Sequence, residues 1–198
     1  VGHAVTEPRG SLVPLREEGV FCGKLQGLSL RNVALRVYED DKKLCEEFGE
    51  MLFTHFGVSG PIVLSASAHM RRFGEARYRL EIDLKPALDE QTLDKRLVSD
   101  FARHANSDLI NAFDELLPKK LIVPFVELTG LDPRQKVHDV TKEQRRRILG
   151  LLKALPVEIA GPRPVEEAIV TSVEDTSGLK VAAVNVRVGG VTFEKPEA

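Results

Sequence analysis

The order of secondary-structure patterns along the chain constrains its fold more than any single motif. Up to about residue 85, apolar residues mostly alternate with polar ones, as in strands, and this alternation returns after Pro156. Between these regions, over 86–155, apolar residues recur at helical spacing instead. Strands at both ends with helices between them predict an α+β fold, in which the last strands complete a β-barrel-like sheet begun by the first.

This order predicts two lobes. Residues 1–85 and 156–198 are expected to form a β-rich lobe, and residues 86–155 an inserted helical lobe. One helix of the helical lobe is predicted to open at Thr141, where the letters TKEQ form a capping box. Another, over 118–130, contains a proline that predicts a kink or a split into two helices. A third carries one apolar stripe, which consists of Leu93, Leu97 and Phe101.

The stretch GEMLFTHFGVSGPIVL at 49–64 marks a corner between a strand and a helix. A hairpin with an acidic tip at 39–41 leads into it. Ser59 is predicted to be the N-cap of a helix that has Pro61 in its first turn and runs as far as Phe73.

The composition is typical of a soluble globular protein, with 42% hydrophobic and 29% charged residues. No apolar run approaches the roughly 20 residues that a membrane-spanning helix needs, and the first residues do not resemble a secretory signal. Cys22 and Cys45 are too few for a disulfide framework, so we expect free thiols and a cytoplasmic protein. The net charge of -2 predicts no general attraction to nucleic acid or to an anionic membrane.

Motifs that bind nucleotides or metals are absent from the sequence. There is no GxGxxG, no GxxxxGK[ST], no GxSxG, no HExxH and no group of Cys and His at zinc spacing. The chain starts without a methionine, and we expect it to be a piece of a longer polypeptide. We therefore predict no metal site, assign no catalytic residue, and expect that this chain alone is not a complete enzyme.

Four residues of the corner are the candidate substrate-binding residues: Thr54, His55, Ser59 and Gly60. His55 follows a strand, in a loop that a rigid scaffold could present to a ligand. A helix start at Ser59 and Gly60 would offer unpaired backbone N–H groups to a phosphate or a carboxylate. Two structural interpretations stay open, namely a hydrogen bond from His55 that fixes the turn and a plain capped helix at Ser59.

A second candidate surface is basic. Residues 118–153 contain nine Lys or Arg and four acids. Three of the arginines are consecutive, at 145–147, so on a helix they fan over about 200° and do not line one groove. Few aromatic residues accompany them, and we therefore favour a solvated helix face. Docking to a partner or dimerisation through this surface is the alternative function, and RNA binding is less favoured still, so a nucleic-acid partner is not expected.

Several stretches resemble a known family. The stretch GEMLFTHFGVSGPIVLSASAH at 49–69, together with GHAVTEPRGSLVPL, LQGLSLRNVALRV and RPVEEAIVT, closely resembles a bacterial family of FAD-dependent, NAD(P)-linked flavoproteins. That family includes aminoacetone-oxidase-like proteins and reductases of bile-acid intermediates. The resemblance covers residues 2 to about 171. The segment over 172–188 departs from the family pattern, either as an extra hairpin or as an altered boundary.

The resemblance implies that this chain is an insert domain. In that family a segment that is partly barrel-like and partly helical interrupts a Rossmann-like flavin domain. FAD would be bound by the flavin-binding domain of the same polypeptide and not by this chain, with NAD(P)H as a reductant and a small molecule as substrate. The whole protein would be an oxidoreductase, in which Thr54, His55, Ser59 and Gly60 line a substrate pocket that excludes water from the reduced flavin.

Overall fold

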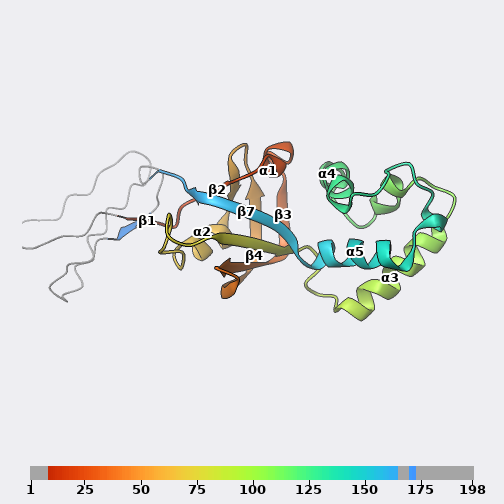
Figure 1. Ribbon diagram of the computed structural model, residues 1–198, viewed down its shortest axis with the longest axis horizontal. Coiled ribbons are helices and arrows are strands. Elements are labelled where there is room, and N and C mark those ends of the chain that lie inside the picture. Colours follow the sequence, from red (N-terminus) through yellow and green to blue (C-terminus); the bar gives the residue numbers. More distant parts are fainter. Residues whose placement is uncertain (1–8, 165–169, 173–198) are drawn as a thin grey trace, which may run out of the picture.

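The computed structural model describes residues 9–164 and 170–172, and its elements follow the predicted order of strands, helices and strands (Figure 1). The first elements are β1 (Arg9–Ser11), β2 (Leu15–Glu17), α1 (Phe21–Lys24), β3 (Ser29–Glu39), β4 (Lys42–Phe53), β5 (Gly57–Ser59), α2 (Pro61–Ser67) and β6 (Tyr78–Asp83). The later ones are α3 (Glu90–Arg103), the 3-10 helix η1 (Leu109–Phe113), α4 (Lys119–Thr129), the 3-10 helix η2 (Val137–Asp139), α5 (Lys142–Lys153), β7 (Leu155–Pro162) and β8 (Val170–Ser172).

Six strands close into a barrel in the order β2-β5-β4-β3-β6-β7. The strand β7 closes it, because it pairs antiparallel with β6 on one side and with β2 on the other. Alternate residues of the strands point inward, as in other small barrels that side chains fill. The buried interior includes Leu35, Val37, Leu80, Ile82 and Val157. The α+β prediction, with a barrel built from strands of both halves of the sequence, is confirmed.

The predicted hairpin is formed by β3 and β4. Its tip is at Asp40 and Asp41, which have φ values of 47° and 65°. Two successive residues with positive φ form the kind of tight turn that matches the twist of a two-stranded ribbon, and Asp tolerates this conformation better than most residues.

The helical part matches two of its three predictions. The stripe of Leu93, Leu97 and Phe101 is buried on α3, and Thr141 and Gln144 form the predicted capping box of α5. Of the kink or split predicted at Pro124, the split is wrong, because α4 is one helix that passes through this proline. Pro124 is itself buried in the core, and this packing offsets the single helical hydrogen bond that a proline removes.

Two predictions at the strand-to-helix corner are wrong. Ser59 belongs to β5, and Gly60, with φ at 98°, is the N-cap residue of α2 without a side-chain cap. A positive φ of this size favours glycine, so the chain places the residue without a side chain at the cap. The helix ends at Ser67 and does not reach Phe73. Ser67 Oγ donates to the Leu64 carbonyl and accepts the N–H of Val13, which fixes the helix end against the segment before β2.

The sequence patterns did not predict α1, η1 or η2. α1 has four residues, and its first N–H groups are satisfied by a side chain that lies outside the helix. Glu17 Oε1 accepts the N–H of Phe21 at 3.1 Å, and Oε2 accepts that of Cys22 at 2.8 Å. Such short elements carry too few apolar positions for a periodicity to be detected.

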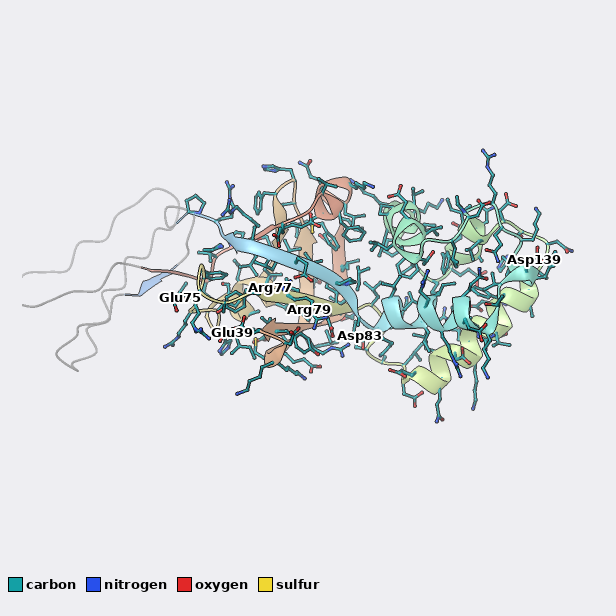
Figure 2. The ribbon with its side chains drawn as sticks, viewed as in Figure 1. Glu39, Glu75, Arg77, Arg79, Asp83 and Asp139 are labelled. Carbon is teal, nitrogen blue, oxygen red and sulfur yellow. The ribbon has the colours of Figure 1, made fainter. Side chains whose placement is uncertain are left out.

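The barrel and the helices meet at a charged network. Lys153 Nζ lies 2.6 Å from Asp83 Oδ2, and the two side chains are only 16% and 9% exposed. The same ammonium donates to the carbonyls of Lys85 and Leu88, at 3.1 and 2.8 Å. Arg36 donates to the carbonyl of Lys153 from the barrel side. Figure 2 shows Asp83 where the barrel gives way to α5.

A separate two-stranded sheet lies at the end of the barrel away from the helices (Figure 1). It pairs β1 with β8 antiparallel, with Arg9 opposite Ser172. The strands predicted from residue 173 onward, and the alternatives for 172–188, fall outside the described residues. Within the described residues, no helix is long and apolar enough to cross a membrane.

Candidate functional site

The structure places the four predicted pocket residues in two pairs, at opposite ends of β5. Thr54 and His55 lie in the turn between β4 and β5, whereas Ser59 and Gly60 lie where β5 passes into α2. Three residues, Phe56 to Val58, separate His55 from Ser59, so the two pairs lie at most about 14 Å apart along the chain. The two pairs are close enough to contact different parts of one ligand, and their role in substrate binding stays a prediction.

Thr54 carries an unpaired polar atom. Its backbone N–H donates to the Gly57 carbonyl at 2.8 Å, which closes the turn. Its hydroxyl oxygen is buried, and it is the one buried side-chain nitrogen or oxygen among the described residues that has no hydrogen-bond partner. A buried polar atom without a partner costs about 1–3 kcal/mol. A ligand group that reached Thr54 Oγ1 would recover that free energy.

His55 is exposed at the same turn. Its ring meets the ring of Phe56 edge to face, with 5.0 Å between centroids and 81° between planes. Arg163 also contacts the ring of Phe56, and its Cζ atom is 4.4 Å from the ring centroid. Sequence patterns could not predict this contact, because 107 positions separate Arg163 from Phe56 along the chain.

Gly60 is held tightly against β4. A Cβ atom at this position would lie 2.9 Å from Met51 Cα and 3.0 Å from the Leu52 backbone nitrogen. The absence of a side chain is therefore required by packing, whether or not a ligand approaches. Ser59 is half-buried opposite Leu52 in the β4–β5 pair. The α2 helix behind them has seven residues.

The short helix α1 covers the turn. A Cβ on Gly23 would be 3.5 Å from the His55 carbonyl, and the ring of Phe21 meets that of Phe53 at 6.2 Å. Cys22 is buried within this contact, and burial raises the pKa of its thiol far above the usual range, with the Glu17 carboxylate acting in the same direction. A thiol that stays protonated is a poor nucleophile, so Cys22 has a packing role here.

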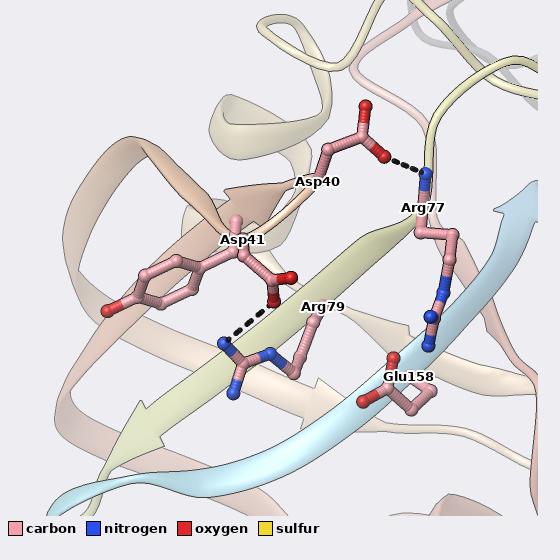
Figure 3. A pocket seen from close by; sticks show the side chains of 6 residues that line it. Asp40, Asp41, Arg77, Arg79 and Glu158 are labelled. Carbon is pink, nitrogen blue, oxygen red and sulfur yellow. Dashed lines mark hydrogen bonds and ion pairs between the residues drawn. The ribbon is translucent and has the colours of Figure 1, made fainter.

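A second candidate is an open cavity of about 400 Å³ on the barrel wall (Figure 3). Arg79 is held at its centre, 2.8 Å from Glu81 and 3.8 Å from Asp41. Its Cζ atom lies 4.9 Å from the Tyr38 ring centroid. The remaining lining residues are Asp40, Arg77 and Glu158. Because three acids and two bases line the cavity, its charge is nearly balanced and it favours no single charge of ligand. Sequence reasoning singled out only the acidic tip of this set.

Among known proteins, a family model described as "HI0933-like protein barrel and H2TH domain" matches residues 9–170. This chain belongs to the HI0933-like family. The family is related to flavoproteins, which agrees with FAD in the whole protein. The narrower resemblance to aminoacetone-oxidase-like proteins and the expected use of NAD(P)H stay predictions.

A curated relative of this HI0933-like chain is the ribosomal RNA dihydrouridine synthase of Haemophilus influenzae. The two are 30% identical over 156 residues, which are 76% of this chain and 35% of the relative. The chain therefore spans about a third of the length of the relative that it matches.

Most cations of the basic stretch over 118–153 bind other residues of the HI0933-like chain. Of the nine Lys and Arg over 118–153, five bond to other residues of the fold. These five are Lys120, Lys136, Arg145, Arg147 and Lys153. Arg145 binds Asp94 on α3, for example, and holds the pKa of that carboxyl below its usual value. The charge excess seen in the sequence thus contributes to packing between helices. No group of acids, Cys or His suited to a metal occurs in the described ranges.

Tyr78 gives the barrel a measurable pH dependence. Burial raises the pKa of its phenol to about 12, and the hydrogen bond that it donates to Glu39, at 2.5 Å, acts in the same direction. Because the folded pKa lies above the unfolded value of about 10, the protonated phenol stabilises the fold below about pH 10, and this stabilisation is lost as the pH rises towards 12. We expect the free energy of unfolding, measured by urea titration, to fall more steeply over this range in the wild type than in Tyr78→Phe. Equal slopes would contradict this assignment.

Proposed function

We propose that this chain is the insert domain of a flavin-dependent oxidoreductase and that it covers the substrate pocket of the flavin domain. The observation that carries this proposal is the pairing of β1 with β8. It brings the two segments that leave the barrel side by side, with Arg9 opposite Ser172. A domain inserted into another one needs its entry and exit close together, because the host chain continues from both. We call the polypeptide that contains both domains the full-length protein.

The described residues do not suit a flavin by themselves. The cavity at Arg79 is open and lined by five charged side chains, unlike the apolar clefts that take flat rings. The sequence also lacks a glycine-rich turn for the FAD phosphates. We therefore assign flavin binding to the rest of the full-length protein, where the cofactor would supply the redox chemistry.

The contribution of this chain is to bind and orient the substrate. The unpaired hydroxyl of Thr54 supports this role, because it offers a buried hydrogen-bonding group to an incoming ligand. The exposed ring of His55 lies next to it on the same turn. Closure of such a surface over the flavin would exclude water from the reduced cofactor.

The substrate that we propose is a uridine in ribosomal RNA. This follows the name of the curated relative, which aligns over most of this chain. The overall charge of -2 gives no general attraction to RNA, so recognition has to be local. Docking or dimerisation through the basic stretch is less favoured, because most of its cations already bind within the fold.

Kinetics of the full-length protein test the pocket assignment. We expect His55→Ala and Ser59→Ala each to lower kcat/KM by about three- to tenfold, the usual loss for one hydrogen bond, without loss of flavin. His104→Ala is the matched control, because His104 is the C-cap residue of α3 in the helical part. Steady-state kinetics that are unchanged in both His55→Ala and Ser59→Ala would overturn the assignment.

A further inference from the structure

Three segments that are far apart in the sequence bring two arginines and two rings together around the β4–β5 turn. Arg16 on β2 has Gly57 of β5 and Gly161 of β7 as its two partners in the barrel. Its Nε atom donates to the carbonyl of Pro162 at 3.3 Å. Arg163 follows directly, so both arginines are anchored at the end of β7, beside the turn that carries Thr54 and His55.

The guanidinium of Arg163 is held by an aromatic ring. Its Cζ atom is 4.4 Å from the centroid of Phe56, and His55 meets the same ring edge-on at 5.0 Å. An arginine that rests on an aromatic face loses part of its rotational freedom, and a planar guanidinium can stack on a base even where its edge donates to another group. We name Arg16, His55, Phe56 and Arg163 the Arg16–Arg163 cluster.

The described carboxylates near this cluster do not neutralise Arg16. Both oxygens of Glu17 accept N–H groups of α1. Glu18 is exposed and forms no ion pair with Arg16. The two terminal nitrogens of Arg16, Nη1 and Nη2, have no hydrogen-bond or ion-pair partner within the part of the chain that the structure describes. The side chain is exposed, so a phosphate could reach these donors.

The Arg16–Arg163 cluster differs from the basic stretch over 118–153 in its aromatic rings. Few aromatic residues accompany the cations of that stretch. Here, cationic donors and aromatic rings occur together on one small surface. This is the combination that proteins use for single-stranded RNA, in which bases stack on rings or guanidinium planes while cations bind phosphates.

We propose that the Arg16–Arg163 cluster binds the nucleotide that flanks the reduced uridine in the RNA substrate. Arg16 binds its phosphate, and the guanidinium of Arg163, backed by Phe56, stacks on its base. The uridine itself then lies towards Thr54, on the adjoining part of the same turn. This inference rests on the RNA substrate proposed above and adds the residues that recognise it.

Binding of a fluorescein-labelled oligouridylate to the full-length protein tests the proposal. We expect the double variant Arg16→Gln/Arg163→Gln to raise Kd by about tenfold or more and to reduce the slope of log K against log salt by about one to two. Arg163→Lys keeps the positive charge but loses the planar guanidinium, so we expect a loss of affinity between those of the wild type and the double variant. The matched control is Arg134→Gln/Arg146→Gln, which removes the same charge from the helical part and should change Kd less than about twofold.

Three outcomes would overturn the proposal in distinguishable ways. If the wild-type protein does not bind the oligouridylate at low salt, both the proposed RNA substrate and the proposed role of the cluster are wrong. If binding weakens equally in the cluster variant and in its control, only the proposed role of the cluster is wrong. Cluster variants that lose affinity for NADPH but not for RNA would show that the site takes the phosphates of a dinucleotide instead. Flavin absorbance and the thermal midpoint of each variant, which we expect to match the wild type, exclude unfolding as the cause.

Discussion

Replacement of Gly57 by alanine is expected to unfold the barrel or to lower its free energy of unfolding by about 3–5 kcal/mol, since overpacking and backbone strain add at one position. A Cβ atom at Gly57 would lie 2.2 Å from the Leu15 carbonyl oxygen and 2.7 Å from the Glu17 backbone nitrogen. Both neighbours are main-chain atoms of β2, and β2 closes the barrel between β5 and β7. The side chain therefore cannot be accommodated unless this strand moves.

Gly150→Ala is the matched control for Gly57→Ala. Gly150 lies within α5, and a Cβ atom there would meet nothing within 4 Å. Alanine is a better helix former than glycine, so we expect this variant to gain about 0.5–1 kcal/mol. Urea denaturation followed by circular dichroism measures both changes. A Gly57→Ala protein within about 1 kcal/mol of the wild type would contradict the close contact between β2 and β5.

Removal of the Lys153 ammonium is expected to cause the second largest loss in the free energy of unfolding. In Lys153→Met the Asp83 carboxylate stays 9% exposed without its partner at 2.6 Å, and the carbonyls of Lys85 and Leu88 lose a donor. Breaking a buried pair from one side costs about 3–5 kcal/mol. We expect about 3 kcal/mol, because Arg36 remains 3.9 Å from Asp83 and partly compensates its charge.

Lys43→Met is the control for Lys153→Met. It breaks an ion pair with Glu46 whose side chains are 48% and 45% exposed, and such surface pairs contribute less than about 1 kcal/mol. The double variant Lys153→Met/Asp83→Leu should recover much of the loss, because no charge is left buried without a partner. Equal costs for Lys153→Met and Lys43→Met, measured by urea denaturation, would show that the network between barrel and helices adds nothing to stability.

The parts of the fold that the sequence predicts are those encoded by local patterns. The stripe of Leu93, Leu97 and Phe101 repeats every four residues, and the capping box at Thr141 is complete within four letters. Both depend on neighbours along the chain, so periodicity and spacing are sufficient to find them. The order of strands and helices likewise predicts the barrel, although not which strands are neighbours in it.

Features that depend on distant segments could not be predicted in this way. Serine is a residue type that often caps helices, so the sequence favours Ser59 as the N-cap residue. Gly60 takes this position instead, because Met51 approaches it closely and its own φ is positive. Only the fold reveals this approach. The same holds for Arg163, which reaches Phe56 because β7 ends beside the β4–β5 turn.

The candidate site was predicted in part. Thr54 and His55 are candidates from sequence because polar residues in an apolar corner are unusual. The structure adds that the Thr54 hydroxyl is buried and has no hydrogen-bond partner among the described residues. Arg16 gave no sequence signal, since a single arginine in a short strand is common. Its proposed role depends on Nη1 and Nη2, which have no partner among the residues that the structure describes.

Visible absorbance most directly tests the central claim, that this chain is the substrate-covering insert of a flavin-dependent protein. The 198-residue chain and the full-length protein should be purified in parallel, and each should be incubated with excess FAD and desalted before its spectrum is recorded. We predict flavin absorbance in the full-length protein and none in the 198-residue chain. Flavin that remains bound to the 198-residue chain, or a full-length protein that retains none, would contradict the account.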